Sequence, residues 1–529
     1  MSSKRLFRCV LTAAVLGVGL GWGYLRPAWG QTASRPAGNS SQPAPADKTP
    51  PTSRPAEALK LTVSQTILMA LENNRALSVQ RYNPDLRRAS VEIQRAVFDP
   101  NLTATLSGQR TRTDDRDTDT VSKSAAASVG VSQFFATGTD VDLSLSTDAT
   151  YQDGPDEWTS RVALDVTQPL LRGFGRAVNL ASLRQARIDL ATSAYELRAY
   201  AETIVSDVEK AYWDYALARQ KTEIVVQSLQ IAERQLVDTK TRIQEGKLAR
   251  GQQAAAVAEV ELRKEELITA RSSEAKAALA LLRLISPQGK SVYTRELSIL
   301  DAPTAAVRNE DLGAVDQHVT KALQQRPDLN QARLAIRRGD IDVVKTRNGL
   351  LPKMDLFITL GRTGYADSFG SSADEVGRNS GYDMEVGLSM EYPPLNRSAR
   401  ATHQRAVLTR DQSTASLANL EELAERDVRS AFLDVLQTQE QIPATAATRK
   451  SQEETLRVEA ARLQVGMSTS LLVNIAQRDL LSSRVSEVEA VVGYLKAMVD
   501  LRRLEGSLLE HHRIVAPGGA PAGMVPPSD

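Results

Sequence analysis

Side chains able to do acid–base or metal chemistry are few in this sequence, and they stand apart from one another. The histidines are His318, His403, His511 and His512, and only the last two are neighbours. His318 and His403 fall singly on expected helices, where packing and surface roles are far commoner than catalysis. A His pair beside a Pro- and Gly-rich tail, without Cys or acid at ligand spacing, does not describe a metal site.

The remaining motifs that can carry chemistry are incomplete. Cys9 is the only cysteine, and it precedes an apolar run at the start of the chain. Gly173-Phe174-Gly175 lacks the third glycine and the βαβ context of a dinucleotide site. The acid-rich run 114–119 lacks the glycine and terminal glutamate of a calcium loop and is better explained as an exposed loop. We therefore expect no catalytic residue, no cofactor and no metal ion.

The overall charge also argues against nucleic acid as a partner. Lys and Arg number 65 against 64 Asp and Glu, so the chain has no strong basic field. Aromatic residues make up only 5% of the chain, which is low for a thick globular core. Ala, Leu, Gln, Glu and Arg are plentiful, as in long packed helices.

Both ends of the sequence differ in composition from the middle. Basic residues, an apolar stretch and the tripeptide Ala28-Trp29-Gly30 predict a cleaved secretory signal peptide over residues 1–30. A single-pass membrane anchor is the alternative. Cleavage would remove Cys9 and leave no cysteine for disulfides or thiolate chemistry. Residues 31–58 are rich in Pro, Ser and Ala, and we expect them, like a tail over 507–529, to be disordered.

The rest of the chain contains an internal duplication. Corresponding segments recur in the same order with small changes of offset, and chance similarity between Ala- and Leu-rich helices does not readily explain a collinear series. We expect a first repeat over 59–285, a linker over 286–311 and a second repeat over 312–506. The matching segments begin at Ala70 and Ala322, Pro100 and Pro352, Asp207 and Asp427, and Arg242 and Arg462.

Each repeat is expected to contain one very long helix, over about 176–244 and 397–465. The first range lacks Pro and Gly, and both carry apolar residues at heptad spacing, which indicates supercoiled helices. About 69 residues span about 100 Å. Leading helices over about 62–98 and 313–350 and trailing helices over about 252–285 and 472–506 are about half as long. Two of these laid end to end match one long helix.

Between the helices, four segments alternate apolar and polar residues with the period of a β-strand. They start near Leu102, Val162, Met354 and Met384, within strand regions of about 101–171 and 353–392. Their length of about ten residues suits a tilted membrane strand. A soluble half-buried sheet is the alternative, but no compact domain is expected to cover its apolar face. Four strands are too few to close a barrel, so several subunits would share one.

The first repeat is longer here than the second. Two more alternating runs lie around 126–133 and 139–147. We expect them to form an extracellular hairpin that extends two barrel strands, in preference to additional barrel strands.

The combined pattern resembles the TolC-like outer-membrane factors of efflux pumps and type I secretion systems. No single motif is diagnostic, but the ordered set covers about residues 59–506. The segments that carry the resemblance are LTVSQTILMALENN (61–74), VTQPLLRGFGRAVNLASLRQAR (166–187), AYWDYALA (211–218), RIQEGKLARG (242–251), ALQQRPDL (322–329) and RLQVGMSTSLLVNIAQRDL (462–480).

The resemblance implies a mainly α-helical fold with a transmembrane β-barrel portion. Three subunits would share a twelve-stranded barrel above a helical tunnel of coiled-coil hairpins. It also implies an outer-membrane exit duct that extends into the periplasm, is embedded in outer-membrane lipid and conducts substrates passively. Its partners would be a periplasmic adaptor and an inner-membrane transporter. A periplasmic coiled-coil adaptor and a structural rod without a pore are the alternatives.

The tips of the helical hairpins are the expected adaptor contacts. The residues that match the family's tips are Gly246, Lys247, Leu248, Gly466, Met467 and Ser468. Alternatively, both glycines merely terminate long helices. The family's acidic ring after the second glycine is missing, because no acid occurs between Met467 and Arg478. Glu245, Lys247 and Arg250 form a candidate tip lock, and a solvated turn is the alternative.

Three acids on the expected strands are candidates for the channel lumen: Asp142, Asp165 and Glu385. At most they would tune ion passage. The sequence does not identify the exported substrate.

Overall fold

The computed structural model describes residues 59–115, 118–151, 157–246, 248–285, 293, 297–301, 303, 312–378 and 381–515. Contacts divide the chain into Met1–Pro55 and Ala56–Asp529, and every described residue belongs to the second part. The expected signal peptide, the Pro- and Ser-rich segment over 31–58, much of the linker over 286–311 and the chain beyond residue 515 lie outside the described residues.

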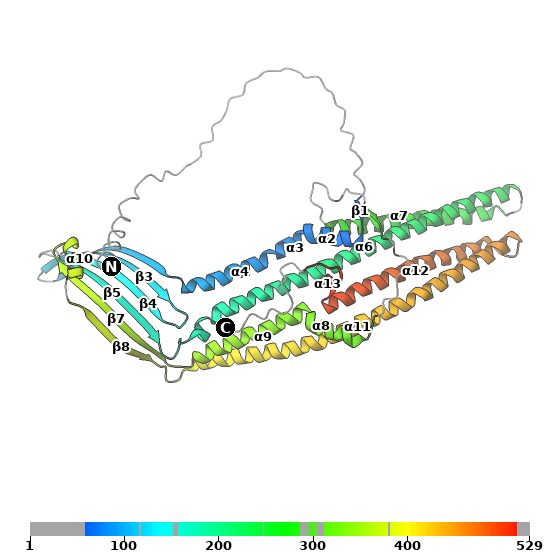
Figure 1. Cartoon of the computed structure of the whole chain (residues 1–529). Coiled ribbons are helices and arrows are strands. Elements are labelled where there is room, and N and C mark those ends of the chain that lie inside the picture. The colour runs from blue at the N-terminus through cyan, green and yellow to red at the C-terminus, as the bar shows by residue number, and fades with distance from the viewer. Residues whose placement is uncertain are drawn as a thin grey trace, which may run out of the picture. The chain divides into compact units, whose positions relative to one another are not determined.

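Two helical hairpins form most of this part. In the first, α6 (Ala181–Gln244) packs along α7 (Gly251–Ile285), and in the second α11 (Arg397–Gln464) packs along α12 (Ser470–Glu505). With 64 and 68 residues, α6 and α11 are each about 100 Å long. A short helix, α5 (Arg176–Asn179), precedes α6. Figure 1 shows the four long elements side by side.

The half of each long helix that lies nearer the sheet is covered by shorter helices. From the first repeat, α4 (Tyr82–Arg95) packs on α6, and from the second α9 (Pro327–Asn348) packs on both α6 and α11. The contacts therefore give four neighbouring helices in the order α4, α6, α9, α11 near the sheet. Toward the hairpin turns the order is α7, α6, α12, α11. The end-to-end arrangement of short helices along a long one follows from these contacts.

Burial along α6 explains why this helix holds its place. Apolar residues spaced three, four or seven apart turn inward, including Leu197, Ala201, Ile204 and Val208, which are at most 6% exposed. Small Ala at such positions allows close approach of neighbouring helices. In α11 the buried positions Ala424, Val428, Ala431 and Val435 repeat the pattern, although Pro443 interrupts the helix interior.

A small region of mixed structure surrounds the middle of the long helices. There β1 (Leu59–Leu61) pairs in parallel with β6 (Leu297–Ile299), which lies within the expected linker. The hydroxyl of Tyr212 donates to the Leu61 carbonyl oxygen at 3.1 Å. The helices here are α2 (Val63–Asn73), α3 (Arg75–Gln80), α8 (Val315–Gln325) and α13 (Leu508–His511).

The start of the expected C-terminal tail is part of this region. Gly506 ends α12 with a φ of 72°, and the chain turns back into α13. Leu508 and Leu509 are 0% and 1% exposed, and each burial contributes about 2 kcal/mol. The expectation of disorder over 507–529 is therefore wrong for residues 507–515. The composition of this segment suggested disorder because the apolar pair is followed by four polar residues, Glu510 to Arg513.

A single six-stranded antiparallel sheet joins the two repeats. Its order is β2-β3-β4-β5-β7-β8, which Figure 1 shows for the labelled strands. The strands are β2 (Asn101–Asp115), β3 (Thr118–Phe134), β4 (Asp140–Tyr151), β5 (Glu157–Pro169), β7 (Lys353–Ala366) and β8 (Asp383–Glu391). A 3₁₀ turn, η1 (Ala96–Phe98), leads into β2, and α10 (Phe369–Arg378) connects β7 with β8.

The fold class expected from the sequence is confirmed, but the number of strands in the subunit is not. All four expected strands are present as β2, β5, β7 and β8. The two further runs form β3 and β4, which are inserted between β2 and β5 and pair with them over their length. They do not extend two other strands, so the expectation of a hairpin that lengthens two strands is wrong. A count of twelve strands for three subunits presumed four per subunit.

Among the described residues, the helices include none that is long and apolar enough to cross a membrane.

Candidate functional site

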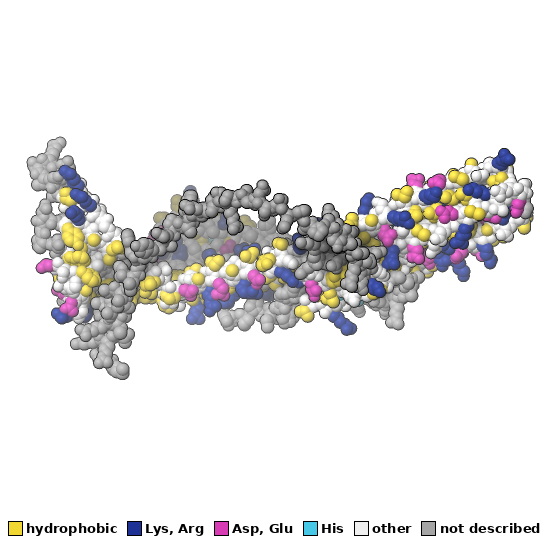
Figure 2. Space-filling view, turned by 90° about the horizontal axis from the view of Figure 1, so that it is seen from above, with side chains coloured by type: hydrophobic (Ala, Val, Ile, Leu, Met, Phe, Trp, Pro, Cys, Tyr) yellow, Lys and Arg dark blue, Asp and Glu magenta, His cyan; other side chains and the backbone are white. Residues whose placement is uncertain are grey.

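The sheet has one apolar face that continues across all six strands. Neighbouring strands place apolar residues directly opposite one another, so a single register row crosses the sheet. Leu102 is 70% exposed, Leu143 49% and Met384 60%. Figure 2 shows hydrophobic side chains gathered on the sheet and charged ones spread along the helical hairpins. The row consists of Leu102, Val131, Leu143, Leu164, Leu360 and Met384.

The opposite face is polar and acidic. Because side chains alternate along a strand, a row displaced by one residue points the other way. The three sequence-predicted lumen residues fall in one such row, although they come from three different strands. Thr359 donates its hydroxyl to Asp165 at 2.5 Å. The row consists of Asn101, Ser132, Asp142, Asp165, Thr359 and Glu385.

Further charges on the polar face are mostly negative. Asp140 and Asp148 project from β4 on the same side as Asp142, since they are separated from it by even numbers of residues. Arg161 pairs with Asp383 at 2.5 Å, and Lys353 pairs with Asp355 at 3.3 Å. These two cations are matched by acids, so the described residues of this face carry excess negative charge.

A short helix covers the apolar face where β5 and β7 are farthest from the long helices. Trp158 lies against Phe369 of α10, with ring centroids 6.1 Å apart, and Ser160 bonds to Ser372 at 2.8 Å. Gly364 lies under α10, where a Cβ atom would come within 2.8 Å of the Val376 nitrogen. The exposed apolar band therefore ends at this level of the sheet.

The two helical hairpins turn in the same way at their ends. Gly246 and Gly466 adopt φ angles of 74° and 79°, which favour glycine. At the second turn the Met467 amide donates to the Arg462 carbonyl at 2.9 Å, which satisfies an orphan carbonyl of α11. Thr469 caps α12 by accepting from the Leu472 amide at 3.4 Å.

The second turn exposes an apolar surface. Val465, Met467 and Leu471 are 70%, 80% and 67% exposed. Ser468 is held by its hydroxyl, which donates to Glu459 at 2.7 Å, and Arg462 pairs with the same carboxylate at 2.9 Å. The Ser468 hydroxyl first, and then Arg462, lower the pKa of Glu459. These bonds brace the turn against α11 while its apolar side chains remain outside.

The first turn has a different surface. Leu248 is half-buried, and Glu245 and Arg250 stand on either side of it, at the end of α6 and before α7. Lys247 lies outside the described residues. The lock between these charges stays a prediction, and neither turn restores the acidic ring that the sequence lacks.

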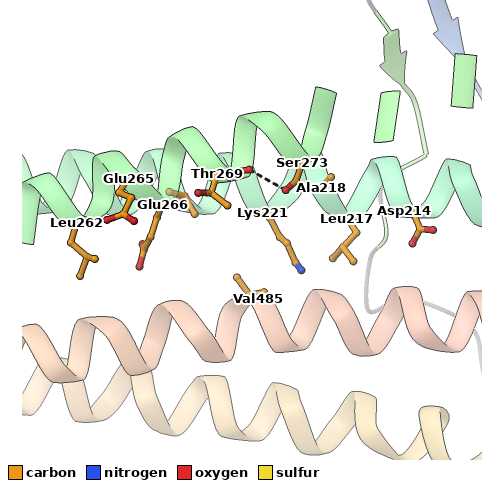
Figure 3. A pocket seen from close by; sticks show the side chains of 12 residues that line it. Asp214, Leu217, Ala218, Lys221, Leu262, Glu265, Glu266, Thr269, Ser273 and Val485 are labelled. Atoms are coloured by element: carbon orange, nitrogen blue, oxygen red, sulfur yellow. Dashed lines mark hydrogen bonds between the residues drawn. The ribbon is translucent and has the colours of Figure 1, made fainter. Parts of the chain in front are cut away.

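A groove runs between α7 and α12 over the surface of α6, with a volume of about 430 Å³ (Figure 3). Glu265 and Glu266 of α7 line it, and Lys221 of α6 points across it toward α12, where it pairs with Glu489 at 2.6 Å. Val485 of α12 lies on the far side. The lining mixes aliphatic stems with solvated charges, and the hydroxyl of Ser273 donates to the Thr269 carbonyl oxygen at 3.0 Å.

No sequence pattern predicted the buried carboxylates near the middle of the helices. Glu505 pairs with His318 at 2.5 Å, and Glu209 pairs with His512 at 3.0 Å. Glu202 is 3% exposed and pairs with Arg198 at 3.1 Å, yet burial raises its pKa to about 7. His318 and His512 thus tie elements together. Over the described residues, Cys, His, Asp and Glu form no group of three or more suited to a metal ion.

The family model for outer membrane efflux proteins matches residues 66–286 and 319–507. The chain belongs to the outer membrane efflux protein family. The two matched segments correspond to the two repeats. Outer membrane protein OprJ of Pseudomonas aeruginosa is 25% identical over 457 residues, covering 83% of this chain and 82% of OprJ.

Two solved structures have the same fold as this chain. CusC superposes with a TM-score of 0.66 at 18% identity, covering 88% of this chain and 99% of CusC. VceC of Vibrio cholerae superposes with a TM-score of 0.62 at 16% identity, covering 84% of this chain and 96% of VceC.

The efflux protein is accordingly an outer-membrane channel that extends into the periplasm, and it is not an enzyme. The alternatives of a periplasmic adaptor and a rod without a pore are set aside by the family assignment.

Proposed function

We propose that three copies of this chain assemble into an exit duct of a tripartite efflux pump or a type I secretion system. Substrates reach the duct through a periplasmic adaptor from an inner-membrane transporter and pass outward without chemical change. The observation that carries the proposal is the sheet with one apolar and one acidic face. In a closed barrel the first meets lipid and the second lines a water-filled lumen.

The edges of the sheet support assembly from several subunits. β2 and β8 are the outer strands, and among the described residues each pairs with one neighbouring strand. Open edges of this length expose unpaired backbone groups, which do not persist in a bilayer. β2 runs away from the helices and β8 runs back toward them, so β8 of one copy can pair antiparallel with β2 of the next.

The helical tips support contact with an adaptor. The exposed side chains of Val465, Met467 and Leu471 form an apolar patch at the second turn, and such a patch on a braced turn suits a partner protein. Leu248 would belong to a less apolar contact at the first turn. Gly246 and Gly466 would then serve both to end the helices and to shape the contact.

Planar-bilayer recording of the purified full-length protein tests the channel, together with its mass in detergent. We expect a trimer that requires detergent and produces discrete conductance steps. A monomer that stays in solution without detergent and gives no conductance at any voltage would refute the proposal.

A further inference from the structure

The two inserted strands reach the end of the sheet where the helices begin. The turn between β3 and β4 is closed by the Phe135 amide, which donates to the Thr139 carbonyl at 2.8 Å. β2 also begins at this end, after η1, and β5 ends there, before α5. Hence β3 and β4 have the same extent as the flanking strands at this end.

Several contacts fix this turn to the junction between strands and helices. The Gly175 amide donates to the Thr137 carbonyl at 3.0 Å. Gly138 has a φ of 95°, and a Cβ atom on it would come within 2.8 Å of Asn179 and 2.9 Å of Pro169. An extracellular projection would have no reason to be fitted so closely against the start of α5.

A second set of contacts joins the turn to the start of β2. The ring of Phe134 stacks on Phe98 of η1 with a centroid distance of 5.9 Å. Thr139 donates to Gln168 near the end of β5 at 2.5 Å. The hairpin is thus attached on both sides at the level where the wall meets the helices.

The faces of the inserted strands match those of their neighbours. Val131 and Leu143 continue the apolar row, whereas Ser132 and Asp142 continue the polar row. Val131 is 40% exposed and Leu143 49%. A strand that projected beyond the bilayer would not need to present the same apolar row as the strands beside it.

The width of the wall agrees with the helices below. Four neighbouring helices set about 8–10 Å apart occupy about 32–40 Å of arc. Six strands spaced about 4.8 Å apart and tilted by about 40° cover about 38 Å, whereas four would cover about 25 Å. The width of the six-stranded sheet therefore falls within the arc of its own four helices, and that of four strands falls below it.

We propose that β3 and β4 cross the outer membrane, so that three subunits close an eighteen-stranded barrel. Six strands per subunit is an even number, which keeps β8 antiparallel to β2 of the next copy. Barrel diameter grows about linearly with strand number, so this exit is about 1.5 times as wide as a twelve-stranded one. Solutes as bulky as the helical tunnel admits can leave through it. The inference rests on the proposed trimeric channel.

Single-cysteine variants in membrane vesicles test the inference, because a chain cleaved after residue 30 has no cysteine of its own. A membrane-impermeant charged maleimide is the probe, and the unsubstituted protein is the blank. We expect rapid labelling of the lumen-facing variants Ser128→Cys and Ser144→Cys. Labelling of Val131→Cys and Leu143→Cys is expected to be at least tenfold slower, because lipid excludes the probe and suppresses the thiolate.

Two variants on β5 separate the possible failures. Leu164→Cys lies in the apolar row and Thr167→Cys on the other face. Equal labelling on β3 and β4 with alternation on β5 would overturn the eighteen-stranded barrel but keep the channel. Equal labelling on β5 as well would overturn the channel itself.

Excision of residues 112–154 provides a second measurement. It leaves a loop of residues 110, 111, 155 and 156 and keeps Leu102 opposite Leu164. In electron micrographs of purified trimers the barrel diameter should fall by about one third. An unchanged diameter would contradict the inference, and if the variant does not assemble, the cysteine labelling decides.

Discussion

At the scale of single residues, the buried carboxylate of Glu202 makes the stability of this channel depend on pH. Its partner Arg198 also donates to the Gly506 carbonyl at 2.8 Å and lies 3.6 Å from Glu510. The ion pair is therefore shared, and desolvation remains the largest influence on Glu202. The folded chain holds the Glu202 proton more tightly than the unfolded chain does.

The sign of the pH dependence follows from this difference. The pKa of Glu202 is about 7 in the folded state against an ordinary 4.5 for a glutamate. The stability that this site contributes is therefore fully present below pH 4.5. It is lost as the pH rises through 7, by at most about 1.4 kcal/mol per pH unit. Glu202→Gln should remove this pH-dependent contribution to stability. The thermal midpoint of detergent-solubilised trimers should then differ less between pH 5 and pH 8 than it does in the unsubstituted protein.

The matched control is Glu196→Gln, which changes an exposed carboxylate of the same helix. It should keep the pH dependence of the unsubstituted protein. If Glu202→Gln and Glu196→Gln unfolded with the same pH dependence, Glu202 would not be the source.

The pairs around Glu202 also show what a sequence cannot supply at this scale. Glu209 and His512 are 303 positions apart, and no local pattern links them. The polar row of Asp142, Asp165 and Glu385 was predictable only as three separate acids on strands. Their alignment depends on the register between strands, which neighbouring chain segments determine together.

At the scale of elements, the second hairpin tip is the best-defined candidate for a protein contact. Met467 and Leu471 are exposed and lie on a turn braced by Ser468. Met467→Asp combined with Leu471→Asp should prevent the host's periplasmic adaptor from co-purifying with the trimers. Trimer mass and bilayer conductance should stay unchanged.

The conservative pair Met467→Leu and Leu471→Met keeps the apolar surface and should retain the adaptor. Full adaptor recovery with the aspartate pair would place the contact elsewhere, with the first tip around Gly246 and Leu248 as the next candidate.

Element type was predictable where the pattern was long and strong. A range without Pro or Gly and with a heptad seam leaves few alternatives to a long helix, and α6 occupies most of it. β3 was harder to interpret because Ala125, Ala127, Ser124 and Ser128 differ little in polarity, so the alternation is faint. Its place in the wall becomes clear only beside β2 and β4, where the neighbouring rows are unambiguous.

At the scale of the whole molecule, assembly would turn one acidic row into a belt. Asp142, Asp165 and Glu385 in each of three subunits bring nine carboxylates to the lumen, and such rings favour cations. Asp142→Asn, Asp165→Asn and Glu385→Gln together should move the reversal potential in a KCl gradient toward zero.

Asp374→Asn is the control, because Asp374 is an exposed acid on α10 that pairs with Arg378 at 2.8 Å. It should leave the reversal potential where it was. An unchanged potential in the triple variant would mean that ions are selected elsewhere along the duct.

The position of the β3–β4 turn has a consequence for how such walls can diversify. The chain enters β3 and leaves β4 at the end of the sheet that lies away from the helices. The two flanking strands, β2 and β5, therefore keep their connections to the helices at the other end. During evolution, strands can then be added to or removed from this barrel only as antiparallel pairs. A single added strand would reverse the direction of every later strand and helix in the chain. With three identical subunits, calibre changes in steps of six strands and never by a finer amount.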